Sequence, residues 1–155
     1  MSSIEGLDEL LDELDSLEQD ILDATALGLA KGLKRTVAIA KALCPADSGQ
    51  LRNSITSVVD RKQDTVDGQA LATAGHAVYV EMGTGPVGQA KHQGVAPVPV
   101  TYRTTGWVYR SKKDGKFYRT KGQPARPYLY PAYKQTRGLI LGDVRKAIEA
   151  RLKER

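Results

Sequence analysis

One stretch divides this sequence into two architectures: Pro45-Ala46-Asp47-Ser48-Gly49-Gln50-Leu51-Arg52-Asn53-Ser54-Ile55. Pro45 cannot continue a helix, and it also pushes the residue before it away from helical angles. Asp47 and Gly49 favour a turn, because an aspartate side chain bonds to the local backbone and a glycine can adopt a positive φ. From Leu51 to Val59 apolar and polar residues alternate loosely, which predicts a half-buried strand. The stretch therefore predicts helices before it and strands with turns after it.

Two amphipathic helical patterns precede this stretch. In the first, apolar residues recur at steps of three and four beside an acidic outer face: Leu7, Leu10, Leu14, Leu17 and Ile21. The second runs from Leu29 to Leu43. Gly28 and Gly32 stand at the join, and each costs a helix about 1 kcal/mol relative to alanine, so we expect a bend there. Their spacing also fits close helix packing.

The first helix has two possible roles. It can cover the core of its own domain, or it can be an arm that docks on a neighbouring subunit. For the domain organisation we expect residues 1–25 to form an acidic amphipathic arm and residues 26–155 to form one α+β domain.

Short elements are expected to follow the Pro45 stretch. The first are a strand over 51–60, a turn at 63–68, a strand beginning at 69 and a strand or buried apolar segment at 77–82. An exposed mobile loop is expected over 83–99, then a hairpin of 107–110 and 116–119 around Asp114-Gly115, and last a helix with Pro131 in its first turn. This order predicts an α+β fold: N-terminal helices, a small antiparallel β-sheet with a long loop and a hairpin, and a C-terminal helix packed on the sheet.

The net charge of +5 conceals a strong asymmetry along the chain. Residues 1–30 contain nine acidic residues and no lysine or arginine, whereas the other 125 residues contain all 23 lysines and arginines and only nine acids. This distribution favours either charge-complementary self-association or two different partner surfaces. No run of residues is apolar enough for a membrane span, so we expect no membrane partner.

We expect no cofactor and no bound metal. Gly83-Thr84-Gly85-Pro86-Val87-Gly88 matches the pattern G-x-G-x-x-G, but a dinucleotide site also needs a helix that begins in the loop, and Pro86 argues against one. His76, His92 and the single cysteine, Cys44, lack the close spacing of a zinc or catalytic cluster. We expect Cys44 to be a small buried hydrophobic residue.

No catalytic residue is expected either, so we predict that the chain is not an enzyme. Glu81 lies in an apolar segment, where a carboxylate usually pairs with an arginine. Arg52 and Arg126 are the candidates, and the three residues are expected to form a polar cluster that holds loops together or extends across a subunit boundary.

The region from 103 to 126 is basic and aromatic. It contains one acid, Asp114, and these basic residues: Arg103, Arg110, Lys112, Lys113, Lys116, Arg119, Lys121 and Arg126. Basic residues neutralise phosphates and aromatic rings stack on bases, so a small nucleic-acid-binding protein is the alternative function. The other interpretation makes the aromatic residues the core face of the hairpin and the charges its solvated face.

Three motifs together resemble a family of tail components from long-tailed double-stranded-DNA bacteriophages. The first is the opening stretch, with Pro45, Asp47, Gly49, Leu51, Arg52, Ser54 and Ile55 at the matching positions. The second is an aromatic segment that ends in E-x-G-T: Tyr79-Val80-Glu81-Met82-Gly83-Thr84. The third precedes the last helix: Ala125-Arg126-Pro127-Tyr128-Leu129-Tyr130-Pro131-Ala132. The motifs occur in the family's order, and the chain is similar to the minor tail protein Z group of that family.

The resemblance implies a structural virion protein that completes the tail or joins head and tail, without catalysis. Members are expected to form a homo-oligomeric ring around the DNA channel in the neck, and a hexamer is expected here. The implied partners are a head-side connector or stopper, a tail terminator or tail tube, and genomic DNA that passes nonspecifically. The implied location is the virion, with assembly in the host cytoplasm. Interface or channel residues would then be Leu7, Leu10, Leu14, Leu17, Lys112, Lys113, Lys116, Arg119 and Lys121.

Overall fold

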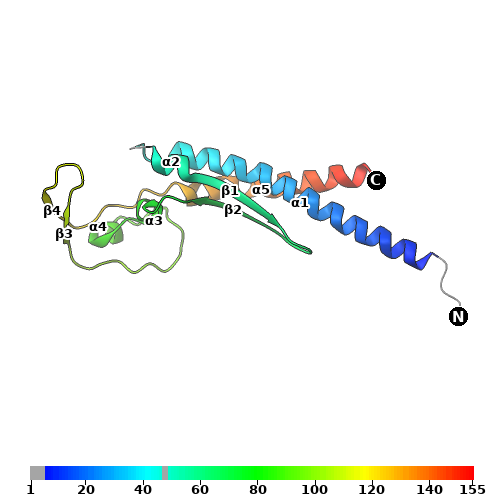
Figure 1. Ribbon diagram of the computed structural model, residues 1–155, viewed down its shortest axis with the longest axis horizontal. Helices are drawn as coiled ribbons and strands as arrows, with labels where there is room; N and C mark the ends of the chain where they lie inside the picture. The colour runs from blue at the N-terminus through cyan, green and yellow to red at the C-terminus, as the bar shows by residue number, and fades with distance from the viewer. Residues whose placement is uncertain (1–5, 47–48) are drawn as a thin grey trace. The chain divides into compact units, whose positions relative to one another are not determined.

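The computed structural model describes residues 6–46 and 49–155 (Figure 1). Its elements, in order, are α1 (Leu7–Leu43), α2 (Gln50–Ser54), β1 (Ile55–Arg61), β2 (Val66–Ala72), α3 (Ala77–Met82), α4 (Gly85–Ala90), β3 (Trp107–Arg110), β4 (Phe117–Thr120) and α5 (Leu129–Lys153). Asp47 of the first motif lies outside the described residues. The α+β prediction is confirmed, but the strands form two separate two-stranded sheets, β1–β2 and β3–β4, where one small sheet was expected, and the C-terminal helix α5 packs on α1. No helix in the described part of the chain is long and apolar enough to cross a membrane.

Two compact units make up the fold. Unit 1 contains residues up to Arg35, Ser57–Ala70 and Thr136–Arg155. Unit 2 contains Thr36–Thr56 and Leu71–Gln135. Helix α1, helix α5 and the β1–β2 pair each contribute residues to both units.

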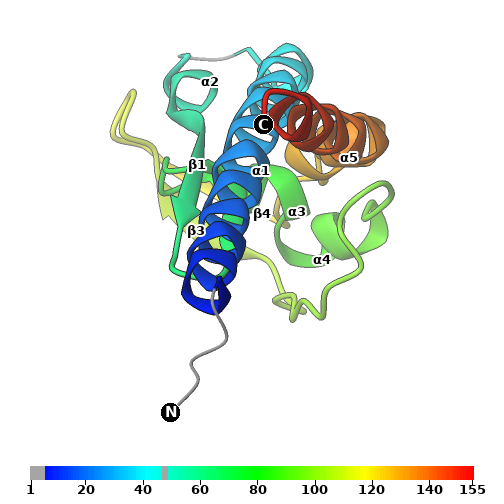
Figure 2. The same cartoon turned by 90° about the vertical axis from the view of Figure 1, so that its right-hand side faces the viewer.

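In unit 1, α1 and α5 lie side by side, and two glycines permit their close approach (Figures 1 and 2). A Cβ atom on Gly28 would lie 2.8 Å from the backbone nitrogen of Val144, and one on Gly32 would lie 2.9 Å from the Cα of Ile140. The close packing expected from the Gly28–Gly32 spacing is therefore confirmed. The helix itself runs without interruption from Leu7 to Leu43, so these glycines do not separate two helices.

Ion pairs join the same two helices. The buried carboxylate of Asp143 on α5 lies 2.8 Å from the Arg35 guanidinium and 3.4 Å from the Lys31 ammonium of α1. Burial opposes ionisation of Asp143, but the hydrogen bond and charge of Arg35, with those of Lys31, outweigh it and lower its pKa. Nearer the end of α5, Arg151 pairs with Asp20 at 2.7 Å.

Unit 2 has a small apolar core that gathers side chains from α1, α2, β1, α3 and α5. Its buried members are Ala40, Cys44, Leu51, Ile55, Ala77, Tyr128 and Ala132. Cys44 is buried, as expected. In strand β1, Ile55 is buried and half-buried residues then alternate with exposed ones as far as Asp60, which is the pattern of a half-buried strand.

Three expectations for the middle of the chain are wrong: those for the start of the first strand, for residues 77–82 and for the loop over 83–99. Residues 50–54 form helix α2 before the strand begins at Ile55, because Gly49 takes a left-handed conformation (φ 77°) that starts a turn of helix. Residues 77–82, expected to form a strand or a buried apolar segment, form helix α3 with Val78 and Tyr79 exposed. Six residues are too few for periodicity to separate a helix from a strand, and the glycine at 83 ends the segment in either case.

The expected loop over 83–99 contains helix α4, which begins at Gly85 and has Pro86 in its first turn, a position that suits proline. The hairpin prediction is confirmed: Trp107–Arg110 pairs antiparallel with Phe117–Thr120. Its turn contains Gly115 at φ 73°. Helix α5 has Pro131 in its first turn, also as expected.

Candidate functional site

The three sequence motifs meet in unit 2, in a cluster that we name the motif junction. Leu51 and Ile55 come from the first motif, Ala77 lies just before the second, and Tyr128 and Ala132 come from the third. All five side chains are buried against one another in the core of the unit. The three motifs therefore converge in unit 2.

Glu81 holds the start of α5 in this junction. Its side chain is only 8% exposed, and its two oxygens accept hydrogen bonds from the backbone N–H groups of Tyr128 (2.8 Å), Leu129 (3.0 Å) and Tyr130 (2.9 Å). The first N–H groups of a helix have no partner within it, and the helix dipole favours a negative charge there. Glu81 of α3 therefore caps α5, although 47 residues of chain separate it from Tyr128.

The sequence pointed to an arginine partner for Glu81, and backbone amides occupy its oxygens instead. Within the described residues no ion pair joins Glu81 to an arginine. The Arg52 guanidinium donates to the carbonyl of Cys44 (3.4 Å). The backbone N–H of Arg126 donates to the carbonyl of Val80 (2.8 Å). Both arginines thus lie at the rim of the motif junction, where they bond to backbone and not to the carboxylate.

Burial in the junction shifts two acidic groups. It raises the pKa of the Cys44 thiol, an effect that the Arg52 charge opposes and the Glu81 charge reinforces. Burial also raises the pKa of Tyr128 to about 12, with smaller contributions from the charges of Glu81 and Cys44. The thiol is therefore kept protonated, as suits a structural cysteine.

Tyr128 makes a testable contribution to stability at high pH. Its folded-state pKa of about 12 lies above the ordinary value of 10.0, so its contribution is present below pH 10 and is lost as the pH rises through 12. We expect Tyr128→Phe to reduce the fall in unfolding free energy over this window. The measurement is denaturant unfolding of both proteins across the window, with Tyr109→Phe, an exposed tyrosine, as the control. If the unfolding free energies of the wild type and of Tyr128→Phe fell equally with pH, the raised pKa would not belong to Tyr128.

The G-x-G-x-x-G segment packs on its own chain. A Cβ atom on Gly83 would lie 2.6 Å from the backbone nitrogen of Ala125, and one on Gly85 would lie 2.6 Å from the carbonyl oxygen of Lys121. Gly83, Gly85 and Gly88 are all buried. These glycines therefore serve close backbone packing around the second motif. In the described part of the chain no three metal-ligating side chains come together.

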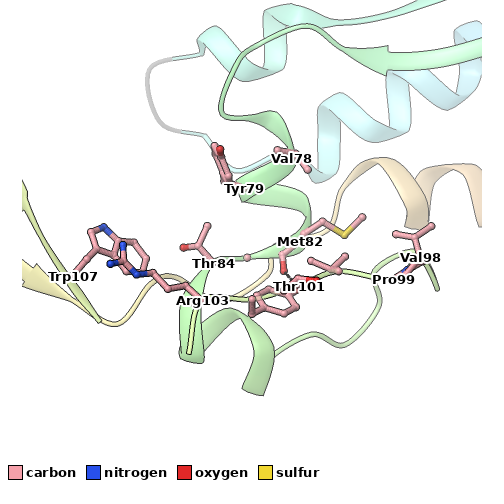
Figure 3. Close-up of a pocket in the computed structure, with 13 residues that line it drawn as sticks. Val78, Tyr79, Met82, Thr84, Val98, Pro99, Thr101, Arg103 and Trp107 are labelled. Atoms are coloured by element: carbon pink, nitrogen blue, oxygen red, sulfur yellow. Dashed lines mark hydrogen bonds between the residues drawn. The ribbon is translucent and has the colours of Figure 1, made fainter. Parts of the chain in front are cut away.

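A second feature of unit 2 is an open cavity of about 650 Å³, which we name the apolar groove (Figure 3). Helix α3 forms one side with Val78, Tyr79 and Met82, and the segment 98–103 forms the other. Trp107 closes one end, where the Arg103 guanidinium lies 5.5 Å from the centre of its ring. The Tyr102 hydroxyl donates to the carbonyl of Met82 at 2.7 Å and fixes the two sides together.

Sequence reasoning missed the apolar groove. Val98 is 47% exposed and Val100 is 37% exposed, and they alternate with prolines in a segment without helix or strand. The alternation of valine and proline was the signal in the sequence that could have indicated an exposed apolar surface, because this segment has no helical or strand periodicity that would turn its valines toward a core.

The β3–β4 hairpin exposes its aromatic residues. Tyr109 is 47% exposed, Tyr118 is 43% exposed and Phe117 is 73% exposed. The interpretation of these rings as the core face of the hairpin is therefore wrong. The basic residues singled out there are exposed as well: Lys112, Lys113, Lys116, Arg119 and Lys121.

The exposed leucines of α1 form a third surface, at its first turns. Leu7 is 44% exposed, and Leu10 and Leu14 are 51% and 50% exposed. Leu17 is half-buried. Two roles were considered for this helix: covering the core of its own domain or docking on a neighbouring subunit. Leu7, Leu10 and Leu14 do not cover the core of their own domain.

A buried carboxylate that fixes one helix, combined with exposed apolar surfaces, suits a component of a larger assembly. The family HK97-gp10-like, described as "Bacteriophage HK97-gp10, putative tail-component", matches residues 8–83 of the chain. The match covers the first motif and all but the last residue of the second. It places this segment in a tailed-phage tail or neck family, and the resemblance drawn from the motifs is confirmed. Comparison with curated proteins and comparison with solved structures each yield no match.

Proposed function

We propose that this phage tail component is a tail-completion or head–tail joining protein that forms a homo-oligomeric ring around the DNA channel in the neck. The observation that carries the proposal is the family match over residues 8–83, together with the third motif at 125–132. Its partners would be further copies of itself, as a hexamer, a head-side connector or stopper, and a tail terminator or tail tube. Genomic DNA would pass through the ring without specific contacts, and assembly would take place in the host cytoplasm.

The surfaces of the protein support this proposal. The apolar groove and the leucines of α1 expose large hydrophobic side chains that a subunit would cover on assembly. The opposite charges of the first helix and of the 103–126 segment allow each subunit to offer different surfaces to its two neighbours, as a heterologous ring requires. The motif junction would set the geometry of unit 2, and its residues are therefore proposed as structural residues.

An amber mutation in the corresponding gene tests the function. We expect the non-permissive host to accumulate DNA-filled heads and separate tails, and we expect expression of the intact chain from a plasmid to restore joined particles. The measurement is electron microscopy of the lysate, with a three-dimensional reconstruction of the wild-type neck to locate the chain. Joined, infectious particles without this chain would contradict the proposal.

A small nucleic-acid-binding protein remains the second candidate. The observation that favours it is the exposure of Tyr109, Phe117 and Tyr118 beside the basic residues of the hairpin. This candidate requires tight binding of the isolated chain to duplex or single-stranded DNA, with an affinity that falls steeply as salt rises. A ring through which DNA slides requires only weak binding, so a salt titration with fluorescent DNA separates the two functions.

A further inference from the structure

The first turns of α1 carry an apolar stripe that unit 1 leaves uncovered. Leu7, Leu10, Leu11 and Leu14 are all between 44% and 51% exposed. Beyond the end of α5, Arg155 reaches Ser16 (3.5 Å) and Asp20 (3.2 Å). The first turns of α1 extend past the C-terminal end of α5 (Figure 1).

The same turns carry negative charges that have no counter-ion among residues 6–46 and 49–155. The acidic residues that form no ion pair within the described part of the chain are Asp8, Glu9, Asp12, Glu13, Asp15 and Glu18. By contrast, Asp20 pairs with Arg151 and Arg155, and Asp23 pairs with Arg61. Unpaired charges and uncovered leucines therefore coincide on one segment, residues 7–18, which we name the acidic leucine segment.

Unit 2 has the complementary surface. The apolar groove is open and lined by valine, methionine, proline and aromatic side chains, with Arg103 at its edge (Figure 3). Trp107, at the end of the groove, begins the hairpin whose exposed side chains include Lys112, Lys113 and Lys116. Asp114 is the one acid between 103 and 126, and the Tyr118 hydroxyl donates a hydrogen bond to it.

We propose that the acidic leucine segment of one copy docks in the apolar groove of a second copy. Leucines at steps of three and four are the anchors that an amphipathic helix presents to a hydrophobic groove. The acids that flank them would face Arg103 and the hairpin lysines of the neighbour, which have no acidic partner within the described residues. Each copy in such a contact still has one free groove or one free segment to offer, so the contact repeats around a ring. The inference deepens the proposed ring and rests on it.

Two complementary variants of the full chain test this contact. The segment variant, Leu10→Gln/Leu14→Gln, removes two exposed anchors, and the groove variant, Val78→Asp/Val98→Asp, places negative charges in the groove. A matched control, Leu139→Gln/Leu141→Gln, removes two leucines of α5 that are 53% and 72% exposed. Circular dichroism and thermal unfolding establish that each variant remains folded, as the exposure of every altered residue leads us to expect.

The readout is sedimentation velocity over a range of protein concentrations. We expect the wild type and the control to associate, and each docking variant to be weakened about tenfold or more per lost leucine or added charge. A mixture of the two docking variants then gives a 1:1 dimer and nothing larger. In that mixture one intact groove meets one intact segment, and the dimer's remaining segment and groove are both disabled. High salt is expected to weaken the dimer, because part of the attraction is electrostatic.

Three results would overturn the inference. A wild type that stays monomeric at its highest soluble concentration removes the contact altogether. Association that survives in both docking variants places the contact elsewhere on the chain. Weakening in only one of the two docking variants indicates contact between two segments or between two grooves instead. The last two outcomes contradict the docking contact but not the proposed ring. A reconstruction of the neck that lacks this chain would contradict the ring, but not a contact between copies measured in solution.

Discussion

Glu81→Ala is expected to destabilise the protein by about 3–5 kcal/mol, the largest effect of any single truncation in unit 2. The change removes the acceptor of three backbone hydrogen bonds from Tyr128, Leu129 and Tyr130, of which the first is fully buried. Hydrogen bonds to a charged group contribute about 1.5–3 kcal/mol each, and a buried donor left without a partner adds its desolvation cost. The expected loss is smaller than the sum of three such bonds, because water can replace the carboxylate at the part-buried N–H groups of Leu129 and Tyr130. The measurement is equilibrium unfolding in urea, followed by circular dichroism.

Two further variants separate the cap from simple loss of packing. Glu81→Gln keeps the size of the side chain but replaces one acceptor oxygen by an amide donor, so we expect it to lose a substantial part of the stability as well. Glu149→Gln alters an exposed glutamate of α5 that pairs with Arg145, and it is expected to change the unfolding free energy by less than about 0.5 kcal/mol. A Glu81→Gln protein as stable as the wild type would show that the carboxylate charge does not hold α5.

Gly28→Ala is expected to destabilise unit 1 by about 1–3 kcal/mol, although alanine is the better helix former. The new Cβ atom would lie 2.8 Å from the Val144 nitrogen and 3.0 Å from the Asp143 carbonyl oxygen. These are backbone atoms of α5, so the helix must move as a whole to make room, and overpacking of this kind costs about 1–3 kcal/mol. The measurement is the thermal midpoint together with urea unfolding.

Gly138→Ala and Gly142→Ala are the matched controls for this prediction. Both glycines lie in α5 with open space around the position of a Cβ atom. There the intrinsic preference of alanine acts alone, and each change should stabilise the helix by up to about 1 kcal/mol. Stabilisation by Gly28→Ala as well would mean that α1 and α5 are not in close contact.

The sequence predicted the parts of the fold that depend on long periodic patterns. Both long helices, the half-buried strand that begins at Ile55 and the hairpin with its Asp114-Gly115 turn carry strong local signals. The short helices α2, α3 and α4 were missed because five or six residues contain too little periodicity to distinguish helix from strand. Pro86 was interpreted as a helix breaker, although proline is favourable where a helix begins.

The motif residues were located correctly, but their partners were not. The sequence singled out Glu81, and the reason to expect an arginine beside it was general: a carboxylate in apolar surroundings needs compensation. Three backbone amides at the start of α5 provide that compensation, and no side-chain pattern reveals which backbone groups will be free. Contacts of this kind depend on tertiary structure. The exposure of Phe117 and of the α1 leucines could not be predicted for the same reason.

The bridge between Thr84 and Gln123 has a consequence for how such chains can diverge. Two backbone hydrogen bonds, of 2.9 and 3.2 Å, join these residues and close the base of the segment between them, which also bonds to the rest of unit 2 through Tyr102 and Lys91. Lengthening a closed loop costs little, about 0.6 kcal/mol for each doubling. Insertions and deletions in this segment can therefore accumulate without disturbing Glu81 or the start of α5. The family match ends at residue 83, immediately before the segment begins. Apart from the groove residues 98–103 and the hairpin lysines, this segment is where one tail protein can differ from another, and where a peptide tag can be grafted.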